Sequence, residues 1–108
     1  MLTITEEHPD PTFVKGFIVI GARVHPGETV SSYIAKGLIT FLTSDSPLAR
    51  RLRQAFIFKI VPMINPDGVI HGNYRANISG ADLNRKWGDC TSWHHQEIYN
   101  MRKMILKC

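Results

Sequence analysis

The sequence has too few cysteines for a disulfide framework and no apolar run long enough to cross a membrane. Its two cysteines are Cys90, in a polar stretch, and Cys108, at the last position. A membrane-spanning helix needs about 18 or more predominantly apolar residues, and the first residues, MLTITEEHPDP, lack both the basic and the apolar part of a secretory leader. We therefore expect an unsecreted, soluble, cytoplasmic protein with no membrane partner.

Extreme charge and low complexity are also missing. Hydrophobic residues make up 44% of the 108 positions, which is typical of one globular domain or of a piece of a larger one. Lys and Arg outnumber Asp and Glu by 13 to 9, a formal net charge of +4. Because the bases are scattered, with Arg50, Arg51 and Arg53 as the densest group, we expect no nucleic-acid partner, although the surplus suits acidic partners.

Apolar patterns along the chain predict alternating strands and helices. Residues 2–5 are predicted to form a short strand. Apolar runs predict two further strands, at 17–22, expected to be buried on both faces, and at 56–61. Helical spacing of apolar residues predicts helices at 28–43, 47–54 and 95–107. Proline, glycine and polar residues predict turns at 62 and 65–68 and a loop at 72–91.

The order of these elements indicates the fold class. A strand followed by helices and a second strand predicts a parallel crossover, hence an α/β fold with a mixed, largely parallel sheet flanked by helices on both faces. Functional sites of such sheets form at the carboxyl ends of strands. The residues after Ala22 and those after Val61 follow two strand ends, so we expect both segments to open on the same rim.

A candidate metal-binding pair follows the first buried strand. His25 and Glu28 are three positions apart in the stretch ARVHPGE, across a Pro-Gly turn. Imidazole nitrogen and carboxylate oxygen both bind zinc, and a catalytic zinc site combines three protein ligands with water. A His and a Glu at this spacing are common by chance, so the interpretation depends on the motifs further along the chain.

Three such motifs follow: NPDG at 65–68, NYR at 73–75 and DLNRKW at 82–87. Together with HPGE at 25–28 they resemble the zinc carboxypeptidases of the carboxypeptidase A superfamily. Within that superfamily, the residues of these motifs most resemble those of the cytosolic carboxypeptidase branch. The resemblance implies an incomplete fold of that family, one zinc ion and hydrolytic release of a C-terminal amino acid. It covers nearly the whole chain, but only the N-terminal part of the family's catalytic domain.

The resemblance also implies a role for each site residue. His25 and Glu28 become zinc ligands, Asn84 and Arg85 bind the C-terminal carboxylate of the substrate, and Arg75 polarises the scissile carbonyl. These roles suit the residue types, because a guanidinium stays charged and its planar fork matches a carboxylate. Removing one donor to an oxyanion typically costs about 10²–10³ in rate, which makes Arg75 a candidate catalytic residue.

Other parts of the family's active site have no counterpart in the sequence. The family's third zinc ligand, a later His, and its general base, a later Glu, are not matched, and neither is its specificity pocket. His94 and His95 precede the last predicted helix and are expected to be structural or exposed. We therefore expect residues 1–108 to be a partial catalytic domain, inactive by itself and marginally stable.

The functional hypotheses follow from this comparison. The leading one is a zinc carboxypeptidase acting on peptide or protein C-termini, with glutamates of acidic tails such as those of tubulin as candidate substrates. The alternative is an aspartoacylase-like amidohydrolase, which has the same His-Glu metal-binding pattern and the same substrate-binding Asn-Arg pair. The NPDG and NYR segments favour the peptidase. A third hypothesis is a non-catalytic fragment that binds acidic C-termini or a protein partner through Arg75 and Arg85.

Overall fold

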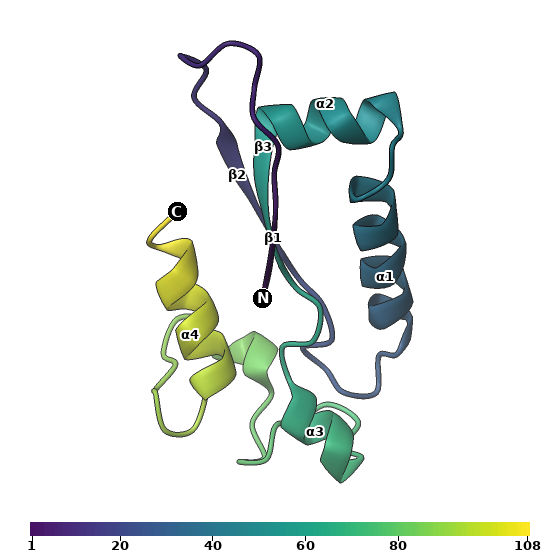
Figure 1. Ribbon diagram of the computed structural model, residues 1–108. Coiled ribbons are helices and arrows are strands. Elements are labelled where there is room, and N and C mark those ends of the chain that lie inside the picture. Colours follow the sequence, from purple (N-terminus) through teal and green to yellow (C-terminus); the bar gives the residue numbers. More distant parts are fainter.

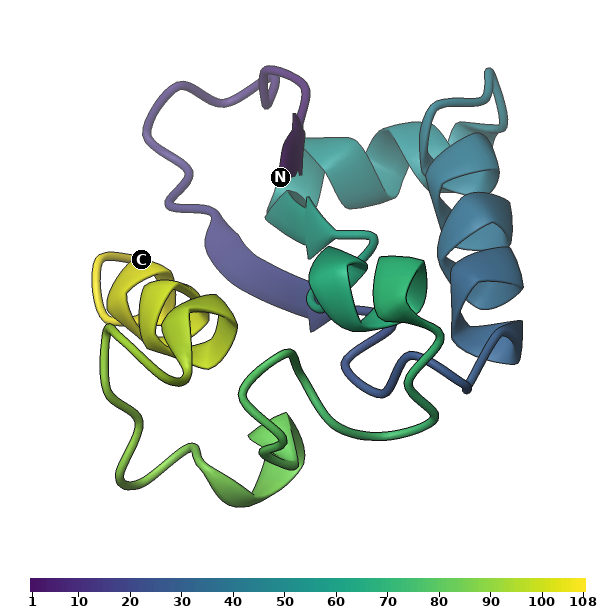
Figure 2. The same cartoon turned by 90° about the horizontal axis from the view of Figure 1, so that it is seen from below.

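A computed structural model describes all 108 residues and contains one three-stranded sheet between two layers of helices (Figures 1 and 2). The strand order is β1-β3-β2, with β1 at Leu2–Ile4, β2 at Gly16–Gly21 and β3 at Phe56–Val61. Strand β1 runs antiparallel to β3, whereas β2 runs parallel to it. The predicted mixed α/β architecture is confirmed, with one parallel and one antiparallel strand pair.

Helices α1 (Val30–Leu42) and α2 (Pro47–Ala55) cover one face of the sheet (Figure 1). They connect the parallel strands β2 and β3. Leu42 packs there against Phe58 and Ile60 of β3, and the alternate residues Ile18 and Ile20 of β2 join the same cluster. Because successive side chains of a strand point to opposite faces of the sheet, these alternate residues all face α1 and α2.

Helix α4 (Gln96–Ile105) covers the opposite face of the sheet (Figure 2). Its buried residues Ile98 and Met101 form a second core cluster with Ile64 and Leu83. Leu83 begins a short 3-10 helix, η1 (Leu83–Arg85), which interrupts the predicted loop. Because the side chain of Leu83 is fully buried, the DLNR segment is fixed to α4.

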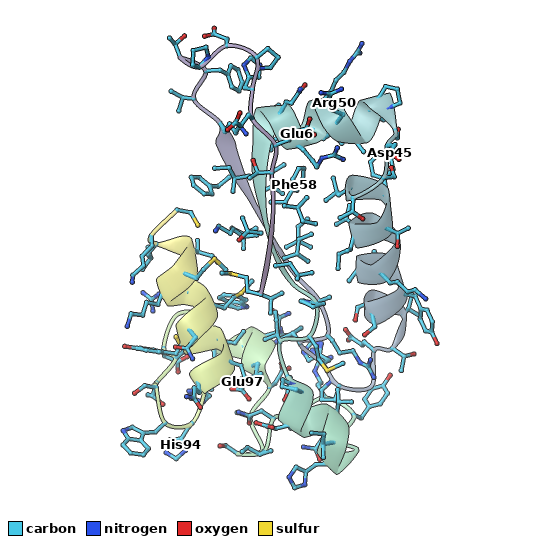
Figure 3. All side chains as sticks on the ribbon, viewed as in Figure 1. Glu6, Asp45, Arg50, Phe58, His94 and Glu97 are labelled. Atoms are coloured by element: carbon cyan, nitrogen blue, oxygen red, sulfur yellow. The ribbon has the colours of Figure 1, made fainter.

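The first residues after β1 are tied to α2 by an ion-pair cluster (Figure 3). Glu6 accepts hydrogen bonds from Arg50 Nε at 2.9 Å and from Arg53 Nη2 at 2.8 Å. Arg53 also donates through Nη1 to the carbonyl oxygens of Leu42 and Ser44, at the end of α1. The hydrogen bond from Arg53, followed by that from Arg50, lowers the pKa of Glu6 below its ordinary value.

Two local predictions are wrong. The turn predicted at 65–68 instead starts helix α3 (Pro66–His71), because Asn65 Oδ1 accepts from the Gly68 amide and a proline occupies the first helical position. Strand β2 was expected to be buried on both faces. It is only partly covered, however, and Phe17 is 45% exposed.

Little of the chain is fully buried. Only 15 of the 108 residues are buried, and large apolar side chains such as Val14, Tyr33 and Trp93 are largely exposed. A small core offsets little of the conformational entropy lost on folding, so low stability follows from this burial. None of the helices combines the length and the apolar character that a membrane crossing requires.

Candidate metal and substrate site

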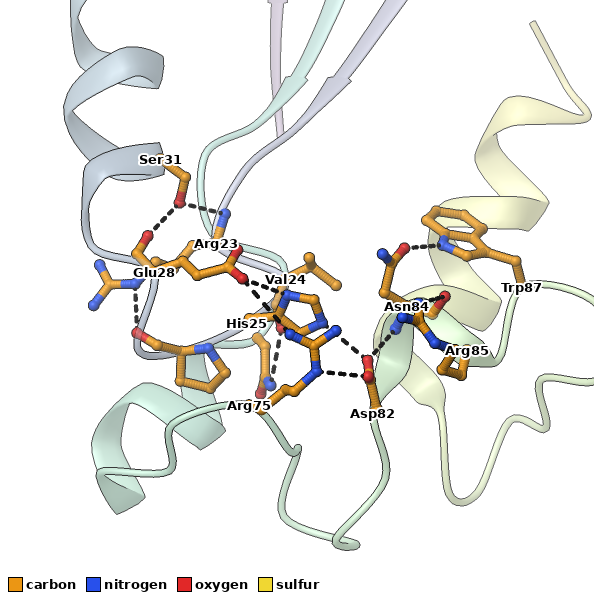
Figure 4. Close-up of polar contacts among 12 residues, drawn as sticks. Arg23, Val24, His25, Glu28, Ser31, Arg75, Asp82, Asn84, Arg85 and Trp87 are labelled. Atoms are coloured by element: carbon orange, nitrogen blue, oxygen red, sulfur yellow. Dashed lines mark hydrogen bonds and ion pairs between the residues drawn. The ribbon is translucent and has the colours of Figure 1, made fainter.

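The site begins at a strained turn after strand β2. Arg23 adopts a left-handed backbone with φ of 55°, which is uncommon for a residue with a side chain. Its guanidinium spans the turn, with Nε donating to the Pro26 carbonyl oxygen at 2.7 Å and Nη1 to Ser32 Oγ at 2.9 Å. Ser31 Oγ accepts from the Arg23 amide and donates to the Glu28 carbonyl oxygen (Figure 4). These bonds fix the turn to the start of α1.

His25 lies inside this turn and contacts two carboxylates. Its Nδ1 is 2.9 Å from Glu28 Oε1, and its Nε2 is 2.9 Å from Oδ1 of Asp82 (Figure 4). The imidazole is 5% exposed, so its orientation is set by these partners and by the surrounding packing. The predicted pair, His25 and Glu28, is therefore brought together at the carboxyl end of β2.

Asp82 holds this cluster from the far side. Its Oδ1 is hydrogen-bonded to Nε2 of His25, and its Oδ2 accepts from Arg75 Nε at 2.8 Å. Oδ1 also accepts from the Asn84 amide. The hydrogen bond from His25, followed by those from Arg75 and Asn84, lowers the pKa of Asp82 from 3.8 to about 2. The carboxyl is thus ionised at neutral pH, and an ionised carboxylate can only accept hydrogen bonds.

This arrangement fits a divalent cation. Because Asp82 is an acceptor, Nε2 of His25 carries the proton that they share, and Nδ1 faces the Glu28 carboxylate. A second proton or a cation must lie between two such electron-rich atoms. Two tetrahedral zinc ligands, each about 2.0–2.2 Å from the ion, lie about 3.4 Å from each other. The observed separation of 2.9 Å is that of a hydrogen bond, so a small outward shift of either side chain would admit the ion.

The donors amount to a pair rather than a complete metal site. No group of three or more His, Cys, Asp or Glu side chains is placed to hold one ion. Asp82 is close, but it contacts the opposite nitrogen of His25 and orients the ring. His95 occupies the N-cap position of α4 without a side-chain capping bond, and its Nδ1 accepts from the Thr91 amide at 3.2 Å, away from the His25 cluster.

Arg75 joins the cluster from the loop after α3. Its Nη1 lies 3.8 Å from Glu28 Oε1, so the guanidinium is beside the His25–Glu28 pair, and its side chain is 45% exposed. The preceding residue binds the turn directly, because the Gly27 amide donates to the Tyr74 carbonyl oxygen at 2.7 Å. A Cβ at position 27 would meet the Tyr74 ring at 2.3 Å, so this close approach requires glycine.

Asn84 and Arg85 lie next to the cluster on η1, and both are exposed. The side chain of Asn84 turns towards α4, where Oδ1 accepts from Trp87 Nε1 at 3.0 Å (Figure 4). Arg85 forms no ion pair and contacts only the Asn84 carbonyl oxygen, at 3.4 Å. Their predicted role in substrate binding stays a prediction, with the guanidinium of Arg85 free to meet an anion.

Sequence reasoning missed Asp82, although it stands in the DLNR motif that was singled out. Its side chain caps η1 by accepting from the Asn84 amide, a role that Asp often has at helix starts. Its contact with His25 crosses 57 positions of sequence, and no local pattern reports such a contact.

The mixed α/β sheet thus brings together a His-Glu pair at a strand end, a carboxylate behind the His and an arginine beside it. A profile of the zinc carboxypeptidase family matches residues 1–103. The chain belongs to this family.

Curated relatives agree with this assignment. The chain is 48% identical to cytosolic carboxypeptidase 6 of Mus musculus over 108 residues, which cover 99% of this chain and 20% of the mouse protein. It is 47% identical to cytosolic carboxypeptidase 1 of Danio rerio, covering 97% of this chain and 10% of that protein. The chain therefore spans a fifth or less of the length of these two relatives.

Solved structures show the same fold. A metallo-carboxypeptidase from Burkholderia cenocepacia superposes with a TM-score of 0.90 at 35% identity, over 97% of this chain and 28% of that one. A metallo-carboxypeptidase from Pseudomonas aeruginosa, solved in complex with (2-guanidinoethylmercapto)succinic acid, has a TM-score of 0.82 at 32% identity, over 97% and 27% of the two chains.

Proposed function

We propose that residues 1–108 form the part of a zinc-dependent carboxypeptidase active site that supplies two ligands of one zinc ion and the arginines that bind substrate. The cluster of His25, Glu28, Arg75 and Asp82 carries the proposal, because it combines a metal-binding pair with a cation for an oxyanion. Family membership supports the same chemistry.

His25 and Glu28 would hold the zinc, through Nδ1 and Oε1. Zinc bound there would supply a Lewis acid for the scissile carbonyl and lower the pKa of bound water to about 7. Asp82 keeps the proton of His25 on Nε2 and thereby keeps Nδ1 available as a ligand. The chain's own contribution is thus an oriented imidazole and a carboxylate at a fixed separation.

Arg75 is proposed to stabilise charge on a substrate. Its guanidinium is held at one end by Asp82 and is exposed, so the remaining N–H groups can meet a carbonyl oxygen beside Glu28. A fixed cation next to the metal-binding pair stabilises negative charge as it develops on that oxygen.

Asn84 and Arg85 are proposed to bind the terminal carboxylate. The guanidinium of Arg85 has no acidic partner in the structure, and the 3-10 helix places it three positions from Asp82. An exopeptidase needs such an anchor, because it must recognise the free end of a chain. Asn84 adds a neutral donor through its amide nitrogen.

The proposed substrates are acidic C-terminal tails, with glutamate as the released residue and tubulin tails as an example, in the cytoplasm. A formal charge of +4 favours the approach of an acidic chain. The relatives named cytosolic carboxypeptidases support the compartment. Glutamate preference requires a side-chain pocket, and this is the part of the proposal that substrate profiling must decide.

We also propose that these 108 residues do not hydrolyse peptides by themselves. Only two zinc ligands are brought together, and no third donor is placed to join them. No carboxylate beyond Glu28 and Asp82 contacts His25, and both are used to hold it. A general base for the attacking water is therefore missing from the cluster.

A chimera tests the catalytic proposal. Residues 1–108 would replace the matching segment of the mouse relative, and release of C-terminal glutamate from a peptide would be measured. We expect activity, with a loss of about 10²–10³ for Arg75→Ala as for other oxyanion donors, and a rise mainly in KM for Arg85→Ala. An inactive chimera that is folded and contains zinc would contradict the proposal, as would cleavage by the 108-residue chain alone.

Binding without catalysis is the second candidate function. It is favoured by the incomplete metal site together with the unpaired guanidinium of Arg85. The 108-residue chain would be titrated with a peptide ending in free glutamate, and with the same peptide amidated at its C-terminus. Preference for the free carboxylate that is lost in Arg85→Ala, without zinc, would support this function.

A further inference from the structure

Asn65 is a buried polar residue to which the proposed mechanism assigns no role. Its side chain is fully buried, between the end of β3 and the start of α3. Buried side-chain polar groups almost always have hydrogen-bond partners, most often backbone groups. The amide of Asn65 finds its partners on both sides of the candidate metal and substrate site.

Three contacts use the hydrogen-bonding groups of this amide. Oδ1 accepts from the Gly68 amide at 2.9 Å and caps α3. Nδ2 donates to the Val24 carbonyl oxygen at 3.3 Å and to the Ala76 carbonyl oxygen at 3.4 Å. Val24 immediately precedes the proposed zinc ligand His25, and Ala76 immediately follows Arg75, so one side chain links both loops.

The chemistry of these contacts is specific to asparagine. A primary amide has one acceptor oxygen and two N–H donors, and all three are used here. Aspartate keeps the capping oxygen but has no donor for the two carbonyls. Serine also keeps an acceptor, but its side chain is too short to reach both loops. A substitution such as Asn65→Asp can therefore remove the hydrogen bonds to the two loops while keeping the cap of α3.

The surrounding packing agrees with a bridge of this kind. A Cβ at Gly68 would lie 2.6 Å from Pro26 Cγ and 2.7 Å from Asn65 Oδ1, so the first turn of α3 rests directly on the His25 turn. The Gly27 amide bonds to Tyr74, which ties the same two loops at a second point. The separation of Arg75 from the metal-binding pair depends on these contacts.

We infer that Asn65 is a positioning residue, whose amide holds the loop of the metal-binding pair and the loop of Arg75 at the spacing that catalysis requires. The inference rests on the proposed function for its catalytic consequence. Its structural part, coupling of the two loops through one side chain, is measurable without zinc.

The test uses the full 108-residue chain and the variant Asn65→Asp, with two readouts. Amide hydrogen exchange of Gly27 reports contact between the two loops, and exchange of Gly68 reports the cap of α3. We expect the Gly27 amide to exchange about tenfold faster in the variant, while the Gly68 amide keeps its protection because aspartate still caps α3.

The second readout is the response of the His25 imidazole resonances to added Zn²⁺, with the metal alone as probe. We expect affinity to fall about tenfold, the lower end of what loss of supporting interactions costs metal sites. The added negative charge of aspartate would by itself raise cation affinity, so a fall points to lost geometry. Asn65→Ser, which adds no charge, gives the same measurement if the aspartate variant does not fold.

The matched control is Asn100→Asp, the same chemical change at an exposed position of α4. It should leave the Gly27 exchange and the His25 response as in the unaltered chain.

Unchanged Gly27 exchange in both Asn65 variants would overturn the inference. So would equal acceleration of Gly27, Gly68 and the β3 amides, since uniform loss indicates general destabilisation. If the unaltered chain shows no His25 response to Zn²⁺, His25 and Glu28 do not hold the metal unaided. The exchange data then still decide the coupling, and the chimera separately tests the proposed function.

Discussion

The Nε2 atom of His25 lies 2.9 Å from Oδ1 of Asp82, a residue 57 positions further along the chain. This contact joins the end of strand β2 to the 3-10 helix that carries Asn84 and Arg85. It thereby connects the metal-binding pair with the segment proposed to bind substrate.

Asp82→Asn should weaken zinc binding. The neutral amide cannot replace a charged acceptor for both His25 and Arg75, and loss of a carboxylate that supports a His ligand typically costs about 10–100-fold in metal affinity. Competition with a chromophoric zinc chelator would measure the change. Asp89→Asn is the control, because Asp89 is exposed and pairs only with Lys86. Equal affinity of the two variants would contradict the role of Asp82.

Gly27→Ala should lower the free energy of unfolding by about 1–3 kcal/mol, the usual cost of inserting a methyl group into a filled space. The new Cβ would lie 2.3 Å from the Tyr74 ring and 2.9 Å from its carbonyl oxygen. Gly37→Ala is the matched control, since no atom lies within 4 Å of its Cβ position in helix α1. It should raise stability by about 0.5–1 kcal/mol. Denaturant unfolding of both variants would show opposite signs.

Glu6→Gln should remove a pH-dependent part of the stability. The pKa of Glu6 is lowered from 4.5 in the folded chain, chiefly by Arg53, so its stabilisation is fully present above about pH 4.5. It is lost as pH falls through the folded pKa. The unaltered chain should therefore be more stable than the variant at pH 7, with the difference fading below pH 4.5 in thermal melts. Glu7→Gln, at an exposed neighbouring position, is the matched control and should leave the stability at pH 7 nearly unchanged.

Arg23→Gly should change stability by less than about 1 kcal/mol, because two effects oppose each other. Glycine relieves the left-handed backbone, which costs other residues about 1–2 kcal/mol, while two side-chain hydrogen bonds of about 0.5–1.5 kcal/mol each are lost. The turn at 24–28 should nonetheless become more mobile, as ¹⁵N relaxation would show. Ser32→Ala removes only one of these bonds and should simply destabilise. A loss above about 2 kcal/mol in Arg23→Gly would show that the clamp outweighs the strain.

Much of the fold could be predicted from local patterns. The apolar run from Phe56 to Val61 and the helical spacing from Val30 to Leu42 each report which side of an element meets the core. The helix after Asn65 was missed because Asn-Pro-Asp-Gly is also a good turn sequence. Capping by Asn65 and packing against Pro26 make it a helix here.

Some residues of the candidate site could likewise be predicted from local motifs, whereas others could not. His25, Glu28 and Arg75 could be singled out because their motifs together resemble a known family. Asp82 and Asn65 could not be found, since each acts on residues brought near only by folding. The carboxylate-binding roles of Asn84 and Arg85 remain predictions.

The sequence by itself determined the alternation of strands and helices, through short-range periodicity, and the family, through the resemblance of its motifs at 25–28, 65–68, 73–75 and 82–87. Zinc binding by His25 and Glu28 stays a prediction. Tertiary structure alone decided which nitrogen of His25 faces Glu28, how close Arg75 lies to that pair, and which buried amide ties the two loops together. Those features depend on distances between segments far apart in the chain, and only the packing of β2, α3 and η1 sets those distances.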